Sequence, residues 1–214
     1  MEMEQLGPRL AAFGVVPVVT IDVAAAAPSL AAALAAGGLP LVEITFRTDA
    51  AADAIAAICR TRPDVLVGAG TVLDVTTVDR AIEAGAEFIV APGFNPAVVE
   101  HCLARGVAVM PGVVTPTEIE MALARGIRLL KFFPAEAMGG TRYISAVAAP
   151  YRQVRFVPTG GVGTANLASY LALPAVAACG GTWIATADAV RAGRWDEIAR
   201  LATEAMKIVR EARP

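Results

Sequence analysis

The 214-residue sequence has one histidine, two lysines and three cysteines, and each shortage excludes a class of site. The single histidine, His101, has Cys102 beside it, and adjacent residues on a helix point in different directions, so we expect no metal site there. The three cysteines form no paired pattern. We therefore predict reduced thiols, a cytoplasmic location, and neither a metal nor a cofactor.

The sequence also lacks a basic surplus and a long apolar run. Its formal net charge is −2, which argues against a nucleic-acid partner. The first residues, MEMEQLGPRL, are too polar and acidic for a signal peptide. Every apolar run is broken by Gly, Pro or charge, so we expect no membrane span and no membrane partner. A composition that is 56% hydrophobic and 18% charged predicts a globular protein with a substantial core.

Short apolar runs alternate regularly with alanine-rich segments of helical period. The expected strands are residues 15–21, 41–46, 65–70, 87–91, 107–112, 129–133, 155–159 and 175–179. The expected helices are residues 29–36, 50–60, 76–84, 96–105, 116–125, 141–149, 164–171 and 187–209. Several helices begin near proline and end near glycine, as capping preferences require.

This alternation predicts an α/β fold with a parallel sheet. Eight repeats favour a closed (β/α)8 TIM barrel over a flavodoxin-like open sheet, which has about five strands. No linker divides the chain, so we expect one domain over residues 1–214. Residues 3–13 would form an extra helix before the first strand.

Polar residues stand out in the second predicted strand, LVEITFR. Strand side chains alternate between two faces, so Val42 and Ile44 would pack on the helices. Glu43 and Arg47 would then point into the mouth of the barrel, where active sites of this fold lie. Charges there are costly unless they are paired or used. A structural ion pair between strand and loop remains an equal alternative.

The sixth predicted strand, LLKFF, carries Lys131 among apolar residues. An ammonium group is expensive to bury, and the neutral amine is the form that attacks a carbonyl group. We interpret Lys131 as a nucleophile; the alternative is a lysine whose head reaches solvent past the strand end. Lys207, in the last predicted helix, reads as an ordinary solvated residue.

Glycine pairs follow the last two predicted strands, at Gly160–Gly161 and Gly180–Gly181. Loops after strands seven and eight of such barrels commonly bind phosphate through backbone N–H groups. Each pair alone could mark only a tight turn. The absence of GxxxxGK[ST] and GxGxxG argues against a nucleotide as the ligand.

Taken together, these segments resemble the 2-keto-3-deoxy-6-phosphogluconate (KDPG) aldolase family, also described as 4-hydroxy-2-oxoglutarate aldolases. The resemblance runs from residue 15 to about residue 189. Its motifs are VEITFRT at 42–48, VGAGTV at 67–72, APGFNP at 91–96, MPGVVTP at 110–116, LLKFFPAE at 129–136, RFVPTGGV at 155–162 and CGGTWIA at 179–185. The KFFPAE segment is the most specific of them.

The resemblance implies a role for each matching residue. Lys131 would form the Schiff base and Glu43 would be the general acid and base. The remaining implied assignments are Arg47 and Thr71 for the substrate carboxylate, Pro92, Phe133 and Thr159 for the pocket, and Gly160, Gly161, Gly181 and Thr182 for the phosphate. The family usually has serine where this chain has Thr182, and more often leucine where it has Phe46.

The implied activity is class I aldol cleavage of KDPG to pyruvate and glyceraldehyde 3-phosphate, with 4-hydroxy-2-oxoglutarate as a second substrate. The resemblance also implies a homotrimer that needs no metal or cofactor. Two alternatives stay open: an aldolase for the galactonate epimer, 2-keto-3-deoxy-6-phosphogalactonate, and a non-aldolase barrel that binds phosphosugars.

Overall fold

The computed structural model describes residues 1–213, in which parallel strands alternate with helices. Pro214, the last residue of the predicted domain, lies outside the described residues. The strands are β1 (Val15–Val19), β2 (Leu41–Thr45), β3 (Leu66–Gly70), β4 (Phe88–Val90), β5 (Ala108–Met110), β6 (Gly112–Val113), β7 (Leu129–Phe132), β8 (Arg155–Pro158) and β9 (Cys179–Gly181).

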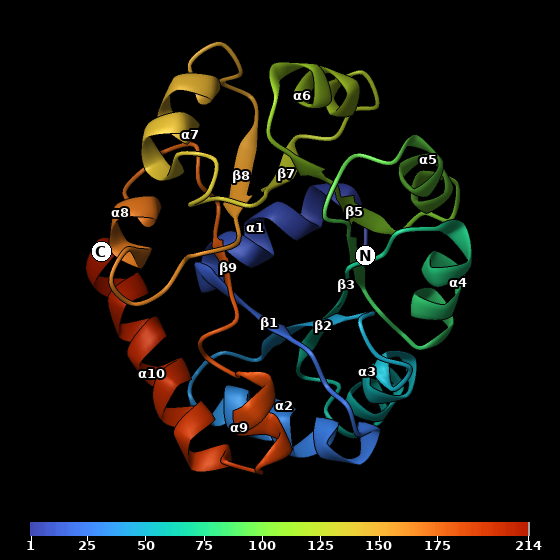
Figure 1. Cartoon of the computed structure of the whole chain (residues 1–214). Coiled ribbons are helices and arrows are strands. Elements are labelled where there is room, and N and C mark those ends of the chain that lie inside the picture. The colour runs from blue at the N-terminus through green and yellow to red at the C-terminus, as the bar shows by residue number, and fades with distance from the viewer. Residues whose placement is uncertain (214) are drawn as a thin grey trace.

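The first helix lies across one end of the sheet, and the other helices cover the outer side of the strands (Figure 1). The helices are α1 (Met3–Phe13), α2 (Ala27–Ala36), α3 (Ala51–Thr61), α4 (Val75–Glu83), α5 (Pro96–Ala104), α6 (Pro116–Leu123), α7 (Gly140–Ala148), α8 (Leu167–Leu171), α9 (Ala187–Arg191) and α10 (Trp195–Ala212), with a short 3-10 turn η1 (Ala24–Ala26). The expectation that several helices begin near proline is confirmed, because Pro28, Pro96 and Pro116 occupy the first turns of α2, α5 and α6.

The strands form a curled parallel sheet. Six of them pair in the order β5-β4-β3-β2-β1-β9, and three pair in the order β6-β7-β8. Pro111, which has no N–H to donate, separates β5 from β6, so the predicted strand 107–112 is divided in two. On the other side, the isolated bridge Phe156–Val176 connects β8 with the segment before β9, and the isolated bridge Thr159–Gly180 connects the residue after β8 with β9 itself. The α/β class and the parallel sheet are therefore confirmed.

Two predicted segments near the C-terminal end differ from the structure. The last strand was expected at 175–179 but β9 is Cys179–Gly181, because Gly180 and Gly181 pair with β1 while Val176 makes only an isolated bridge. The last helix was expected as one segment, 187–209. It divides into α9 and α10 because Gly193 adopts a left-handed φ of 65°, which no helix can continue through.

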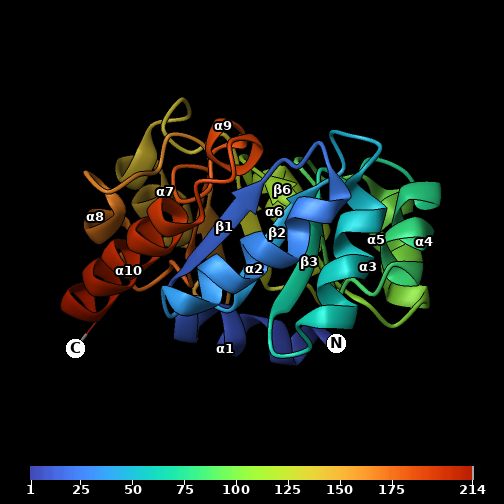
Figure 2. The same cartoon turned by 90° about the horizontal axis from the view of Figure 1, so that it is seen from below.

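The extra N-terminal helix is confirmed, and it closes one end of the sheet. Figure 2 shows α1 beneath the strands, on the side at which they begin. Leu6 and Leu10 of α1 are fully buried in the core. The Ala108 N–H of β5 donates to the Met1 carbonyl at 3.0 Å, which holds the start of the chain against the sheet. The opposite end, where the strands finish, is the one at which a site can open.

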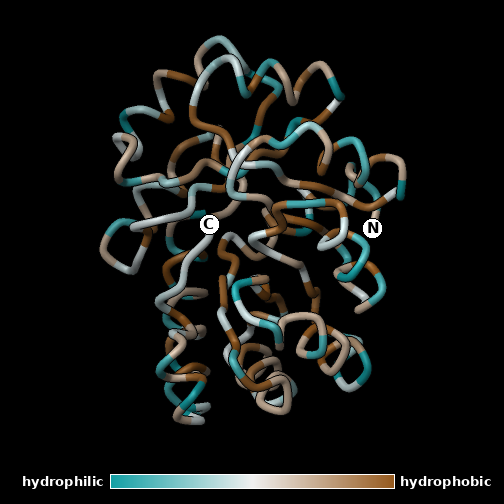
Figure 3. Tube along the Cα trace, turned by 45° about the vertical axis from the view of Figure 1, so that its right-hand side comes forward, coloured by the Kyte–Doolittle hydropathy of each residue, from teal (hydrophilic) through white to brown (hydrophobic). Residues whose placement is uncertain are grey.

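Apolar stretches concentrate on the inner strands, while the surrounding helices alternate between apolar and polar residues (Figure 3).

The guanidinium of Arg213, just after α10, donates to the carbonyls of Leu171, Val176 and Ala177 and so ties the C-terminal helix to the segment before β9. In the described part of the chain, no helix combines the length and apolar character needed to cross a membrane.

Helix α6 begins with a complete capping box. The Thr115 hydroxyl accepts from the Glu118 N–H at 3.4 Å, and Glu118 Oε2 accepts from the N–H groups of Thr115 and Val114, both at 2.8 Å. Partial burial alone would raise the pKa of the Glu118 carboxyl, but these hydrogen bonds lower it below its ordinary value of 4.5. The carboxylate thus binds its proton less readily in the folded chain than in the unfolded chain.

We expect Glu118→Ala to lower the free energy of unfolding by about 1 kcal/mol at neutral pH, as the loss of a helix cap does. Because the folded-state pKa is lowered, this stabilisation is complete above pH 4.5 and is lost as the pH falls through the folded-state pKa, which lies below 4.5. Urea midpoints measured at both ends of that range test this.

The matched control is Glu83→Ala, because Glu83 is an exposed glutamate of α4 with no side-chain hydrogen bond among the described residues. It should leave the midpoint almost unchanged. A Glu118→Ala destabilisation that persists undiminished at acidic pH would show that the carboxylate charge is not what the capping box uses.

Candidate active site

Two opposite charges face each other inside the sheet. Glu43 of β2 and Lys131 of β7 have side chains only 2% and 6% exposed, and the Lys131 Nζ lies 3.4 Å from Glu43 Oε1. In Figure 1 the two strands lie on opposite sides of the interior that the curled sheet encloses, so the pair spans this interior. A buried charge requires a partner, and each of these groups supplies the partner for the other.

The alternation of side chains along β7 places Lys131 on the inner face. Phe132, next in the chain, faces the helices, where its ring stacks on Tyr143 of α7 at 5.6 Å and meets Phe156 edge-on at 6.3 Å. Phe133 returns to the inner face, and its ring centroid lies 5.5 Å from the Lys131 Nζ. The alternative of a lysine whose head reaches solvent past the strand end is therefore wrong.

A glycine on the neighbouring strand provides the space for the Glu43 carboxylate. Gly70 ends β3, and a Cβ atom built there would lie 2.1 Å from Glu43 Oε1. Any side chain at position 70 would therefore displace the carboxylate from Lys131. Gly70 stands within the VGAGTV motif of residues 67–72, yet nothing in that motif marks it for a role, because a missing side chain gives no chemical signal of its own.

Arg47 lies beyond the end of β2, which finishes at Thr45 rather than at Phe46. Its guanidinium is exposed, and its Nε donates to the Thr71 hydroxyl at 3.2 Å. The alternative of a strand–loop ion pair between Arg47 and Glu43 is thus wrong: the charged partner of Glu43 is Lys131. Thr71 has a left-handed φ of 58°, which is uncommon for a β-branched residue and marks a constrained turn after β3.

Pro92 follows the fourth strand and packs closely on the sixth. A Cβ atom at Gly112 would lie 2.1 Å from the Pro92 carbonyl oxygen, so only glycine allows this approach. Gly112 is the register partner of Lys131. Pro92 and Phe133, both half-buried, thus lie near the lysine from different strands.

The two glycine loops lie on neighbouring chain segments. Thr159 is 6% exposed and forms a bridge with Gly180 of β9, and a Cβ atom at Gly180 would lie 2.3 Å from the Thr159 hydroxyl oxygen. Gly160 and Gly161 follow with left-handed φ values of 97° and 82°. Thr182 follows β9 with its side chain exposed.

The predicted residues thus come from the carboxyl ends of several strands. Direct contacts join Glu43 with Lys131, Arg47 with Thr71, Lys131 with Phe133, and Thr159 with Gly180. Gly181 pairs with Pro17 of β1, and Thr182 lies exposed just after it.

The cysteines and the histidine lie outside this group. Burial raises the pKa of the Cys102 thiol to about 12, and burial also raises that of Cys179 to about 12, so neither is a ready nucleophile. His101 on α5 hydrogen-bonds Asp79 on α4 at 2.9 Å. Within residues 1–213, no three His, Cys, Asp or Glu side chains gather as a metal site would require.

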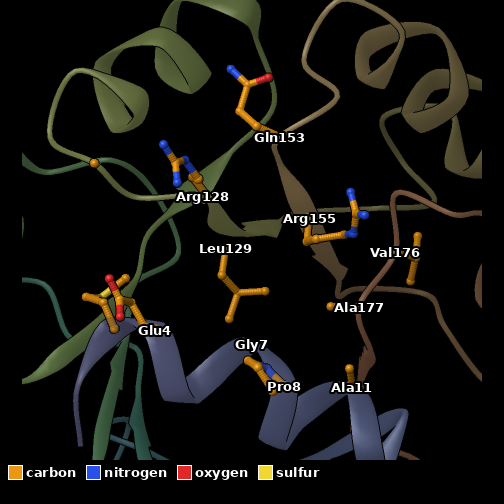
Figure 4. A pocket seen from close by; sticks show the side chains of 12 residues that line it. Glu4, Gly7, Pro8, Ala11, Arg128, Leu129, Gln153, Arg155, Val176 and Ala177 are labelled. Atoms are coloured by element: carbon orange, nitrogen blue, oxygen red, sulfur yellow. The ribbon is translucent and has the colours of Figure 1, made fainter.

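A cavity of about 500 Å³ lies at the other end of the sheet, between α1 and the starts of β7 and β8. Figure 4 shows Gly7, Pro8 and Ala11 of α1 on one side and the guanidinium groups of Arg128 and Arg155 on the other. These two guanidinium groups point away from each other, so they do not converge on one point in the cavity. Because polar groups in a binding pocket converge, this cavity is not the candidate active site.

In this site a buried amine faces a buried carboxylate near the carboxyl ends of parallel strands. This arrangement is typical of enzymes in which a lysine attacks the carbonyl group of the substrate. Comparison with known proteins identifies the family. The chain belongs to the KDPG and KHG aldolase family, whose model matches residues 8–201.

Individual relatives support this membership over nearly the whole chain. A 2-dehydro-3-deoxy-phosphogluconate aldolase from Treponema pallidum is 52% identical over 195 residues, which cover 91% of this chain and 93% of the relative. The crystal structure of a KDPG aldolase from Legionella pneumophila, with pyruvate captured as a covalent carbinolamine intermediate, has a TM-score of 0.90 and 37% identity and covers 93% of this chain and 97% of that one.

A second solved structure, the KDPG aldolase of Zymomonas mobilis with 3-phosphoglycerate, has a TM-score of 0.88 and 38% identity. It covers 95% of both chains. The resemblance found in the sequence is therefore confirmed, and the chain is a member of a lyase family.

Proposed function

We propose that this protein is a class I aldolase that cleaves KDPG to pyruvate and glyceraldehyde 3-phosphate. The observation that carries this proposal is the buried pair of Lys131 and Glu43, 3.4 Å apart, in a member of the KDPG and KHG aldolase family. The family is named after KHG as well as KDPG, and KHG is 4-hydroxy-2-oxoglutarate. We therefore propose a second activity, the cleavage of 4-hydroxy-2-oxoglutarate to pyruvate and glyoxylate.

The chemistry begins at the Lys131 amine. Its attack on the C2 ketone of the substrate, followed by loss of water, yields an imine. The protonated imine withdraws electrons, so the C3–C4 bond breaks with its electron pair held as an enamine. Glu43 accepts the proton of the C4 hydroxyl, which releases glyceraldehyde 3-phosphate, and proton return followed by hydrolysis releases pyruvate. Proton transfer by a positioned side chain contributes about 10²–10⁴-fold to such a step.

The 3.4 Å separation between Lys131 Nζ and Glu43 Oε1 suits a carboxyl group that acts both as general acid and as general base. The carboxylate lies within reach of the nitrogen at which water is lost and of the atoms next to it. Its burial excludes bulk water, which strengthens the attraction between the iminium charge and the carboxylate.

The remaining predicted residues surround this pair, and we assign them to parts of the substrate. Arg47 and Thr71, already joined by a 3.2 Å hydrogen bond, would hold the substrate carboxylate. Phe133, beside the lysine, and Pro92 would shape the apolar wall. Thr159 would lie near the substrate hydroxyls, since it follows Val157, the register partner of Lys131.

The phosphate would bind at the two glycine loops, through Gly160, Gly161, Gly181 and Thr182. Consecutive left-handed residues expose backbone N–H groups on one side of the chain, and the bridge from Thr159 to Gly180 brings the loops together. The exposed Thr182 hydroxyl is free to donate to a phosphate oxygen.

We also infer that the strands close into an eight-stranded (β/α)8 barrel within one domain over residues 1–214. The two bridges between β8 and the β9 segment support closure on one side. Continuity through Pro111, whose carbonyl accepts from the Lys131 N–H at 3.0 Å, supports it on the other. We infer a cytoplasmic location from the three free cysteines, because thiols persist in reducing compartments.

Trapping with borohydride tests the imine. We expect incubation with pyruvate and sodium borohydride to add one reduced pyruvate to the wild-type protein and none to Lys131→Ala, as measured by intact mass. Peptide mapping should locate the adduct on Lys131. The matched control is Lys207→Ala, since the Lys207 side chain is 70% exposed and forms a surface ion pair with Glu211; it should gain the adduct as the wild type does. An adduct retained by folded Lys131→Ala would overturn the assignment.

Gly70→Ala tests the placement of Glu43. The new Cβ would lie 2.1 Å from Glu43 Oε1, so the carboxylate must move. We expect kcat for KDPG cleavage to fall about 100-fold, the effect of an ångström-scale misplacement, while borohydride trapping on Lys131 persists. Gly7→Ala, where nothing lies within 4 Å, is the control. An unchanged kcat for folded Gly70→Ala would remove Glu43 from the reaction.

The family resemblance also leads us to propose a homotrimer. Light scattering coupled to size exclusion should give three times the mass of the chain at micromolar concentration. A mass of one or two chains would contradict this proposal without affecting the assignments of Lys131 and Glu43.

A further inference from the structure

The loop that follows the lysine strand is hydrogen-bonded to the glycine loop that follows β8. The Ala135 N–H donates to the Thr159 carbonyl at 2.8 Å, and the Glu136 N–H donates to the Gly160 carbonyl at 3.0 Å. Lys131 and the Gly160–Gly161 loop are therefore connected through five residues of chain and two backbone hydrogen bonds. Movement of one loop must affect the other.

The side chain of Glu136 supports the glycine loop directly. A Cβ atom added at Gly161 would lie 2.6 Å from the Glu136 Cβ and 2.5 Å from its Cγ, so the glutamate stem packs against the bare face of Gly161. A Cβ atom at Gly140 would approach Glu136 Oε1 to 3.1 Å. Two glycines thus leave room for this one side chain, although its residue is largely exposed otherwise.

The carboxylate of Glu136 is hydrogen-bonded to Tyr170 of α8. The Tyr170 hydroxyl donates a hydrogen bond to Glu136 Oε1, and Tyr170 is fully buried. Burial raises the pKa of the Tyr170 hydroxyl, and the hydrogen bond to Glu136 raises it further, so the phenol remains a donor at every physiological pH. The bond directs the negative charge of Glu136 toward α8. A carboxylate released from it would be free to repel an anion at the adjacent loop.

We propose that Glu136 and Tyr170 are positioning residues that hold the Gly160–Gly161 loop in the shape that binds the substrate phosphate. This inference rests on the proposed function. It assigns the pair no contact with the reacting carbon atoms, since the contacts of Glu136 are with the glycine loop and Tyr170, whereas Lys131 contacts Glu43 and Phe133.

The pair should therefore matter for a phosphorylated substrate and not for an unphosphorylated one. Tyr170→Phe removes only the hydroxyl, and Glu136→Ala removes the stem beneath Gly161. We expect each to raise KM for KDPG about 10-fold, the usual effect of losing a hydrogen bond to a charged group, with kcat changed less than KM. KM for 4-hydroxy-2-oxoglutarate, which has no phosphate, should stay unchanged.

Two further variants separate positioning from general damage. Glu136→Gln keeps the stem and an oxygen that accepts from Tyr170, so it should restore KM for KDPG to near the wild-type value. Tyr151→Phe breaks another tyrosine–glutamate hydrogen bond, the 2.9 Å contact with Glu120, and should leave both substrates unaffected.

Equal losses on both substrates in Tyr170→Phe, or an unchanged KM for KDPG in both Tyr170→Phe and Glu136→Ala, would overturn the positioning role. Failure of the proposed function would look different, because the wild type itself would then neither cleave KDPG nor trap pyruvate on Lys131.

Discussion

The arrangement of this protein depends on one costly interaction, the burial of an amine and a carboxylate 3.4 Å apart within an apolar interior. Neither charge could stay there alone, because an isolated buried ion loses more in desolvation than packing returns. Pairing with Glu43 allows the Lys131 amine to lie in the apolar interior, and this position allows the amine to react with a substrate. At this depth water is excluded and a carbonyl substrate is the natural partner for the nitrogen.

Missing side chains shape the site as much as charged ones do. Gly70 leaves space for the Glu43 carboxylate, Gly112 allows the Pro92 carbonyl to approach, and Gly180 leaves space for the Thr159 hydroxyl. At each position a single Cβ atom would lie within 2.3 Å of a neighbouring oxygen. Close-packed interiors cannot absorb such a contact without moving backbone. These glycines therefore set the distances on which proton transfer and ligand binding depend.

Local chemistry made much of the fold predictable from the sequence. Period-2 and period-3.6 patterns identified the parallel sheet, and the apolar residues around Lys131 in LLKFF correctly indicated a buried strand. The predicted element bounds were wrong where backbone pairing or a single dihedral angle decides where a strand or helix ends. Gly180 and Gly181 carry no apolar signal yet form β9, and Gly193 divides a helix whose side-chain pattern continues past it.

The sequence by itself determined which chemical groups exist: one lysine in an apolar strand, one glutamate at an inward position, and glycine pairs after the last strands. It could not determine which groups meet. Lys131 and Glu43 are 88 residues apart, and the carboxylate met the lysine rather than Arg47, its near neighbour along the chain. The same holds for Tyr170, whose helix gave no sign of its partner 34 residues earlier. Only the tertiary structure decided these pairings, because curvature of the sheet, not separation in sequence, sets the distance between side chains on different strands.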